Sequence, residues 1–133
     1  MDQVTGRRSS GRITGFYESL TMQLCVWSEH YFGLNKPDKE GITEREHLEQ
    51  VERQTGRKLE ALESPTEFPR CIAHVWSAFV ALNSDRSEGF NGPNPISYQQ
   101  IKAWKELTET PVTAWEIAAI KRVDVVYMGI ANG

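Results

Sequence analysis

Few residues in this sequence have a type and spacing that suit metal binding. Cys71 and His74 form a Cys-x-x-His pair, and three-residue spacing places both side chains on one face of a helix. A tetrahedral zinc site needs a second such pair, but the remaining candidates share no ligand spacing: Cys25, His30 and His47. We therefore predict no metal site and two reduced thiols in apolar surroundings.

The sequence patterns of nucleophilic catalysis and phosphate binding are also missing. No serine lies in a Gly-x-Ser-x-Gly turn, and the only basic neighbours of a cysteine are Arg70 and His74. Gly89 and Gly92 lack the preceding strand and the following Gly-Lys-Ser/Thr of a phosphate-binding loop. We predict no catalytic residue and no cofactor, and hence a protein that is not an enzyme.

Glu116 and Asp124 are the carboxylates best placed for paired acid–base chemistry. They lie eight residues apart on an expected helix, so two turns of about 5.4 Å each separate them. That distance is long for joint work on one bond. A structural role is favoured, in which Arg86 ties the loop that follows it to Glu116 or Asp124 through a bidentate ion pair.

Two apolar stripes with three- and four-residue steps indicate the elements that position these groups. The first stripe predicts a well-buried helix over residues 16–32 that ends at Gly33: Phe16, Leu20, Leu24, Trp27 and Tyr31, widened by Met22, Val26 and Phe32. The second predicts a helix that starts near Pro69: Phe68, Ile72, Val75, Phe79 and Leu82, beside Trp76 and Val80.

Three hydroxyl residues are each followed three positions later by Glu or Gln, the capping-box pattern of a helix N-terminus: Thr43 with Glu46, Ser97 with Gln100, and Thr113 with Glu116. They predict further helices over residues 43–55, 97–107 and 113–128, the first ended by Gly56. The β-branched run at 123–128 leaves a strand open as an alternative. Glycines and prolines at 87–95 exclude a regular helix or an inner strand there.

These elements predict a mainly α protein, a small single-domain bundle of about four to five helices with a Gly/Pro-rich loop at 87–95. We expect a flexible polar leader at residues 1–12 and one helical domain at 13–130, with the distinctive motifs in 62–130. The net charge of −3 and the pI near 5.6 argue against a nucleic-acid or membrane partner. Without a spanning stretch of about 20 apolar residues, the expected location is the cytoplasm.

DNA binding remains the alternative from another functional class. Two short capped helices at 97–107 and 113–128 resemble a helix-turn-helix, which would make this a small DNA-binding regulator using residues 97–128. The first turns of the second helix offer Trp115, Glu116 and hydrophobes, where a recognition helix needs polar and basic groups. Lys121 and Arg122 come later in that helix than base contacts require.

The C-terminal half carries a more specific set of residues: Trp76, Phe79, Leu82, Arg86, the run Gly-Phe-Asn-Gly-Pro-Asn-Pro-Ile-Ser at 89–97, Ile101, Trp104, Trp115, Glu116, Val123, Asp124 and Tyr127. Over residues 62–127 this set resembles the phage tail assembly chaperones, which long-tailed phages encode beside the tape measure gene. The likeness includes the downstream part of frameshift-linked chaperone pairs in lambda-like phages. The resemblance implies that the family's structural scaffold is built on these residues: Trp76, Phe79, Arg86, Gly92, Pro93, Pro95, Trp104, Trp115, Glu116 and Asp124.

The resemblance also implies a function. Such proteins bind the tape measure protein during tail assembly in the host cytoplasm, help to recruit tail tube subunits, and are absent from the mature virion. Self-association and a frameshift-linked partner remain open. Trp115 is expected in the core, whereas Phe90 fits either the core or a partner contact.

Overall fold

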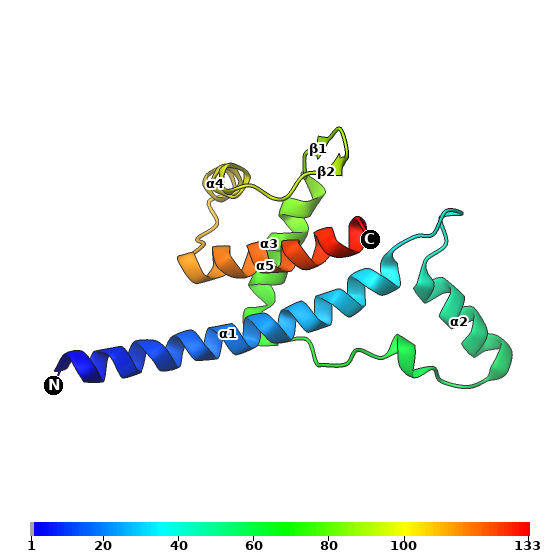
Figure 1. Cartoon of the computed structure of the whole chain (residues 1–133), viewed down its shortest axis with the longest axis horizontal. Helices are drawn as coiled ribbons and strands as arrows, with labels where there is room; N and C mark the ends of the chain where they lie inside the picture. Colours follow the sequence, from blue (N-terminus) through cyan, green and yellow to red (C-terminus); the bar gives the residue numbers. More distant parts are fainter. Residues whose placement is uncertain (1) are drawn as a thin grey trace.

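The computed structural model describes residues 2–133, with side chains from Gly15 onward. These residues form five α-helices, two single-turn 3₁₀-helices and one small sheet: α1 (Asp2–Asn35), α2 (Glu44–Thr55), η1 (Glu60–Leu62), η2 (Arg70–Ile72), α3 (Ala73–Ser84), β1 (Glu88–Gly89), β2 (Gly92–Pro93), α4 (Tyr98–Leu107) and α5 (Ala114–Ala131) (Figure 1). The predicted mainly α bundle is therefore confirmed. The leader expected at residues 1–12 lies outside the residues whose side chains are described, and it stays a prediction.

Helix α1 buries a different face from the one predicted. Leu24 and Phe32 are buried, but so are Thr21 and Ser28, while Met22 is 58% exposed. The two hydroxyls donate to carbonyls of their own helix, Thr21 to Tyr17 at 2.8 Å and Ser28 to Cys25 at 3.1 Å. Because these hydrogen bonds satisfy both hydroxyls, their burial costs little. The prediction of a well-buried helix is wrong for Phe16, Met22 and Val26, which are 57%, 58% and 45% exposed.

The end of α1 also differs from the prediction. The helix passes through Gly33 and ends at Asn35, so the glycine does not stop it. Leu34 is only 5% exposed, and continuing the helix is what carries this side chain into the core. Pro37 follows two residues after the last helical residue, where its ring prevents a further turn.

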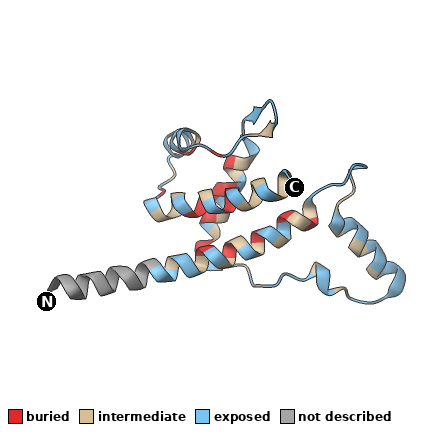
Figure 2. Cartoon of the chain, viewed as in Figure 1, coloured by how far each residue is buried: buried red, intermediate tan, exposed pale blue. Residues whose placement is uncertain are grey.

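Helix α2 has the predicted ends but packs loosely. The Thr43 hydroxyl accepts from the Glu46 amide at 3.2 Å, and Gly56 adopts a left-handed φ of 71° while its N–H donates to the Glu52 carbonyl. No residue of this helix is buried. In Figure 2, α2 is coloured only as exposed or intermediate, and the buried residues lie in other elements such as α1, α3 and α5.

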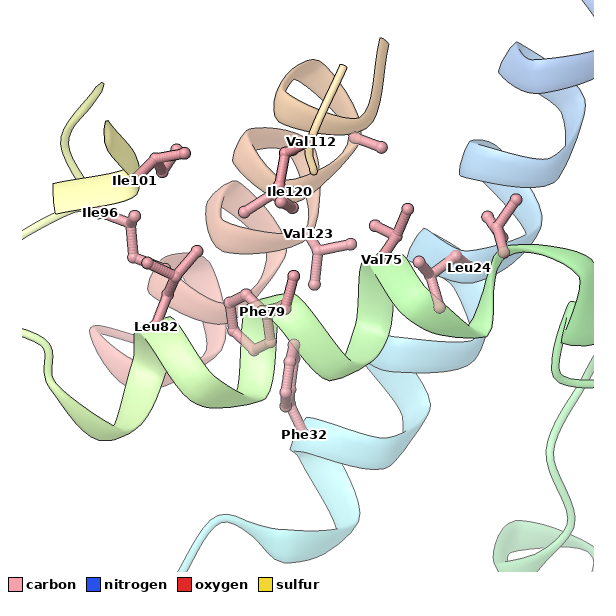
Figure 3. Close-up of a cluster of buried hydrophobic side chains, with 13 residues drawn as sticks. Leu24, Phe32, Val75, Phe79, Leu82, Ile96, Ile101, Val112, Ile120 and Val123 are labelled. Atoms are coloured by element: carbon pink, nitrogen blue, oxygen red, sulfur yellow. The ribbon is translucent and has the colours of Figure 1, made fainter. Parts of the chain in front are cut away.

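The core forms where α3 crosses the parallel pair α1 and α5. The two helices are parallel, because the residue numbers increase together along three contacts: Tyr17 with Trp115, Phe32 with Tyr127, and Lys36 with Ile130. The predicted α3 stripe is confirmed, although its first turn after Pro69 is the 3₁₀-helix η2. The buried cluster drawn in Figure 3 joins these helices to α4: Leu24, Phe32, Ile72, Val75, Ala78, Phe79, Leu82, Ile96, Ile101, Val112, Ala119, Ile120 and Val123.

The Gly/Pro-rich loop contains the small sheet, which the sequence did not predict. Glu88 pairs with Pro93 and Gly89 with Gly92 in an antiparallel hairpin of two-residue strands. Gly92 has a φ of 112°, a conformation that only glycine adopts easily. The residues at 123–128 are helical, so the alternative of a strand there is wrong.

At two of the three predicted capping boxes the hydroxyl caps the helix, but the hydrogen bonds of the described residues include no return bond from the Glu46 or Gln100 side chain. The Ser97 hydroxyl accepts from the Gln100 amide at 3.0 Å and starts α4. Thr113 precedes α5 without a side-chain cap, because its hydroxyl donates to the Glu116 carboxylate at 2.7 Å. The third capping-box prediction is therefore wrong in its bonding, although the helix begins where the pattern placed it.

Candidate functional site

A buried ion pair links the loop after α3 to α5. The Arg86 Nη2 donates to Asp124 Oδ1 at 2.5 Å, and the two side chains are only 5% and 4% exposed. Asp124 Oδ2 accepts instead from the Ile96 amide at 2.8 Å. Of the two predicted carboxylates, Asp124 is therefore the one that pairs with Arg86. The predicted bidentate geometry is wrong, because the second carboxylate oxygen holds the backbone before α4.

The rest of the Arg86 guanidinium is also engaged. Its Nε donates to Asn83 Oδ1 and its Nη1 to the Asn94 carbonyl, both at 2.9 Å. Its Cζ lies 4.5 Å from the centre of the Tyr127 ring, within reach of a cation–π interaction. One side chain therefore joins α3, α5 and the base of the hairpin at Asn94.

Further hydrogen bonds close the base of the hairpin. The Asn94 amide donates to the Ser87 carbonyl at 2.9 Å, and its side chain donates to the Ser87 hydroxyl at 3.2 Å. Lys121 Nζ donates to the Ile96 carbonyl at 2.7 Å and lies 4.5 Å from the Tyr98 ring centre. The segment that follows the hairpin is thus held before Pro95 by Arg86, and after Pro95 by Asp124 and Lys121 of α5, so the base of the hairpin is fixed.

Phe90 lies at the tip of this hairpin and packs against nothing. Its relative exposure is 104%, compared with 85% for Leu107 and 72% for Val125. Between the core and contact interpretations left open by the sequence, the structure places Phe90 at the surface. The hairpin therefore presents a fully exposed aromatic ring on a fixed base.

The predicted tryptophans are partly buried and pack against the core from three different helices. Trp76 meets Trp27 edge to face at 5.0 Å and lies 5.7 Å from Phe79. Trp115 stacks on Tyr17 with ring centres 4.2 Å apart, and Trp104 packs against the core from α4. Tyr17 had no signal in the sequence beyond its apolar character, because its partner lies on the last helix.

Glu116 belongs to a separate cluster from Asp124. Glu116 Oε2 lies 3.3 Å from His74 Nε2, and its other oxygen accepts from Thr113. His74 is paired in this way. Cys71 is a free thiol but is exposed on η2, so the prediction of apolar surroundings is wrong for this cysteine. Across the part of the chain that the structure describes, no three His, Cys, Asp or Glu residues gather as metal ligands.

The two short helices do not present a free recognition helix. In the first turn of α5, Trp115 is stacked on α1 and the Glu116 side chain is 15% exposed against His74. Lys121, one of the two basic residues of this helix, donates to the Ile96 carbonyl. Trp115, Glu116 and Lys121 are therefore engaged within the molecule, and the exposed Arg122 lies in the third turn of α5, past the turns that contact base edges.

Three of the side chains that the structure describes have a shifted pKa, and each shift has a local cause. A hydrogen bond from His47 to Asp38, at 3.1 Å, lowers the pKa of the carboxyl and raises the pKa of the imidazole. The backbone amides of Ile42 and Glu40 also stabilise the Asp38 carboxylate. Burial raises the pKa of the Cys25 thiol, and the nearby Arg122 guanidinium opposes that shift.

The fold and site together define a small helical domain that carries an anchored, aromatic-tipped hairpin. The sequence profile of the phage tail assembly chaperones matches residues 51–129, more than half of the chain, and the protein belongs to this family. The match begins in α2, further towards the N-terminus than the resemblance at 62–127. No curated protein and no solved structure matches this chain. No described helix has the length and apolar character that crossing a membrane requires.

Proposed function

We propose that this protein is a non-enzymatic tail assembly chaperone that binds the tape measure protein in the cytoplasm of the infected cell. The observation that carries the proposal is the exposed Phe90, held on a rigid hairpin inside the region that matches the family. Tail tube subunits are further partners under this proposal, and the protein leaves before the virion is complete. Self-association or a frameshift-linked partner is compatible with the same role.

The energetics of Phe90 support a contact role. Burying a phenylalanine side chain contributes about 1.5–3 kcal/mol, and a ring that is exposed in the free protein gains all of it on binding. The hairpin base is fixed by Arg86, Ser87 and Asn94 before the partner arrives. Little conformational entropy is therefore lost at this site on association.

Co-expression with the tape measure protein of the same phage tests the proposal. We expect the tape measure protein to be soluble and to co-purify with this chain, and to aggregate without it. A tape measure protein that stays equally soluble alone and does not co-purify would contradict the proposed function.

The contact itself is tested by Phe90→Ala, with Leu107→Ala as the matched control. Both side chains are largely exposed, so neither change should move the unfolding midpoint. Phe90→Ala removes a ring that the complex would bury, so it should weaken binding by about tenfold or more. Leu107→Ala, at the end of α4, should leave binding unchanged. Equal binding by the two variants would exclude Phe90 as a contact.

A further inference from the structure

A groove of about 400 Å³ runs between α1 and α5 in the first half of their parallel packing. One wall is α1 and the other is α5, and the stacked pair of Tyr17 and Trp115 closes one end. The lining residues are few and mostly apolar or small: Tyr17, Glu18, Thr21, Trp115, Ala118, Ala119 and Arg122. This groove is separate from the Phe90 hairpin, which packs near the other end of α5.

The donors on the floor of the groove are engaged within their own helices. Thr21 is 5% exposed and its hydroxyl donates to the Tyr17 carbonyl, and Ala119 on the facing helix is 1% exposed. Backbone groups on both walls belong to regular helices and are internally bonded. A polar loop or an extended strand would leave its own backbone groups unpaired there, whereas a helix would not.

The rims of the groove carry opposite charges. Glu18 lies on the α1 rim and Arg122 on the α5 rim, and both are exposed. The three ion pairs among the described side chains involve neither residue. A helix that is basic along one flank and acidic along the other would complement both rims at once.

The apolar track continues beyond the groove. Val125 lies seven residues after Ala118, on the same face of α5, and is 72% exposed. Phe16, next to Tyr17, is 57% exposed at the opposite end. The track from Ala118 to Val125 covers about 10 Å of α5, which corresponds to the i and i+7 anchors of a docked helix.

We propose that the α1/α5 groove binds one amphipathic α-helix of the tape measure protein, with small apolar residues on its buried stripe, a basic flank against Glu18 and an acidic flank against Arg122. This inference rests on the proposed function and adds a second, independent surface to it.

Filling the groove tests the site. Ala118→Trp introduces a large ring over the α5 wall, and Ala103→Trp does the same on the exposed face of α4. The first should weaken co-purification of the tape measure protein by about tenfold or more, and the second should not. Arg122→Glu gives an independent test that adds no bulk. It should weaken binding, and far-UV circular dichroism verifies the fold of each variant.

Photo-crosslinking identifies the occupant. A benzoylphenylalanine at position 118 of the full chain should crosslink to a helical tape measure segment with the stated charge pattern, and one at position 103 should not. If the tape measure protein co-purifies but no crosslink forms from 118, or the crosslink joins two copies of this chain, the inference is overturned while the proposed function stands. If the tape measure protein never co-purifies, the proposed function itself fails.

Discussion

Replacing Asp124 by alanine removes the partner of a buried cation and the acceptor of a buried amide. The Arg86 side chain is 5% exposed and the Ile96 residue is fully buried, so neither group regains water in the variant. Removing one member of a buried ion pair costs about 3–5 kcal/mol, and an orphaned amide alone costs about 1–3 kcal/mol. We expect Asp124→Ala to lower the free energy of unfolding by about 4 kcal/mol.

Urea denaturation followed by far-UV circular dichroism measures this loss. With an m-value of about 2 kcal/mol per molar urea, the midpoint should fall by about 2 M. Glu116→Ala is the matched control, because it also removes a carboxylate from α5, but its partner His74 has a side chain that is 53% exposed. A pair with one exposed member contributes about 0–1 kcal/mol, so the control should shift the midpoint by less than about 0.5 M.

Equal midpoint shifts for Asp124→Ala and Glu116→Ala would refute the reasoning, because burial would then not distinguish the two carboxylates. A second variant separates the ion pair from the loss of packing. Arg86→Met combined with Asp124→Leu removes both charges and fills the space with apolar atoms. It should recover about 1–2 kcal/mol relative to Asp124→Ala, since no uncompensated charge stays buried.

Two further predictions concern a pH-dependent contact and the helix caps. The raised pKa of His47 should return towards about 6.5 in Asp38→Asn, as measured by an NMR titration of the imidazole. The raised pKa means that the contact stabilises the fold below the unfolded pKa of His47 and is lost as the pH rises through the folded value. The lowered pKa of Asp38 means that the Asp38 carboxylate stabilises the fold above the pKa that it has in the unfolded chain. This stabilisation is lost as the pH falls through the pKa of Asp38 in the folded protein. Ser97→Ala should cost about 1 kcal/mol in urea unfolding, and Thr113→Ala clearly less, since only Ser97 caps a backbone amide.

How far the sequence predicts burial depends on how each helix satisfies its polar groups. The stripe of α3 was predictable, because Ile72, Val75, Phe79 and Leu82 are apolar and share one helical face. On α1 the apolar pattern misled, because Thr21 bonds within its own helix and can be buried at little cost. Which face of α1 meets α5 is a tertiary choice that local periodicity does not encode.

For the ion pair and the helix caps, the sequence predicts which residues take part better than it predicts which hydrogen bonds they form. The sequence offered Glu116 and Asp124 as partners for Arg86, and the crossing of α3 with α5 brings only the second within reach. Thr113 has the same pattern as Ser97 but does not cap, since Glu116 turns its carboxylate to the Thr113 hydroxyl and His74. These outcomes depend on residues about 40 positions apart, which no local motif contains.

Helix α5 connects the two proposed binding surfaces. Lys121 and Asp124 hold the segment that follows the hairpin, and Trp115 and Ala119 line the groove that α5 forms with α1. The helix therefore lines the groove near its first residues and lies beside the hairpin near its last ones. The buried ion pair then has a functional consequence, because it fixes the orientation of the hairpin relative to the helix that lines the groove.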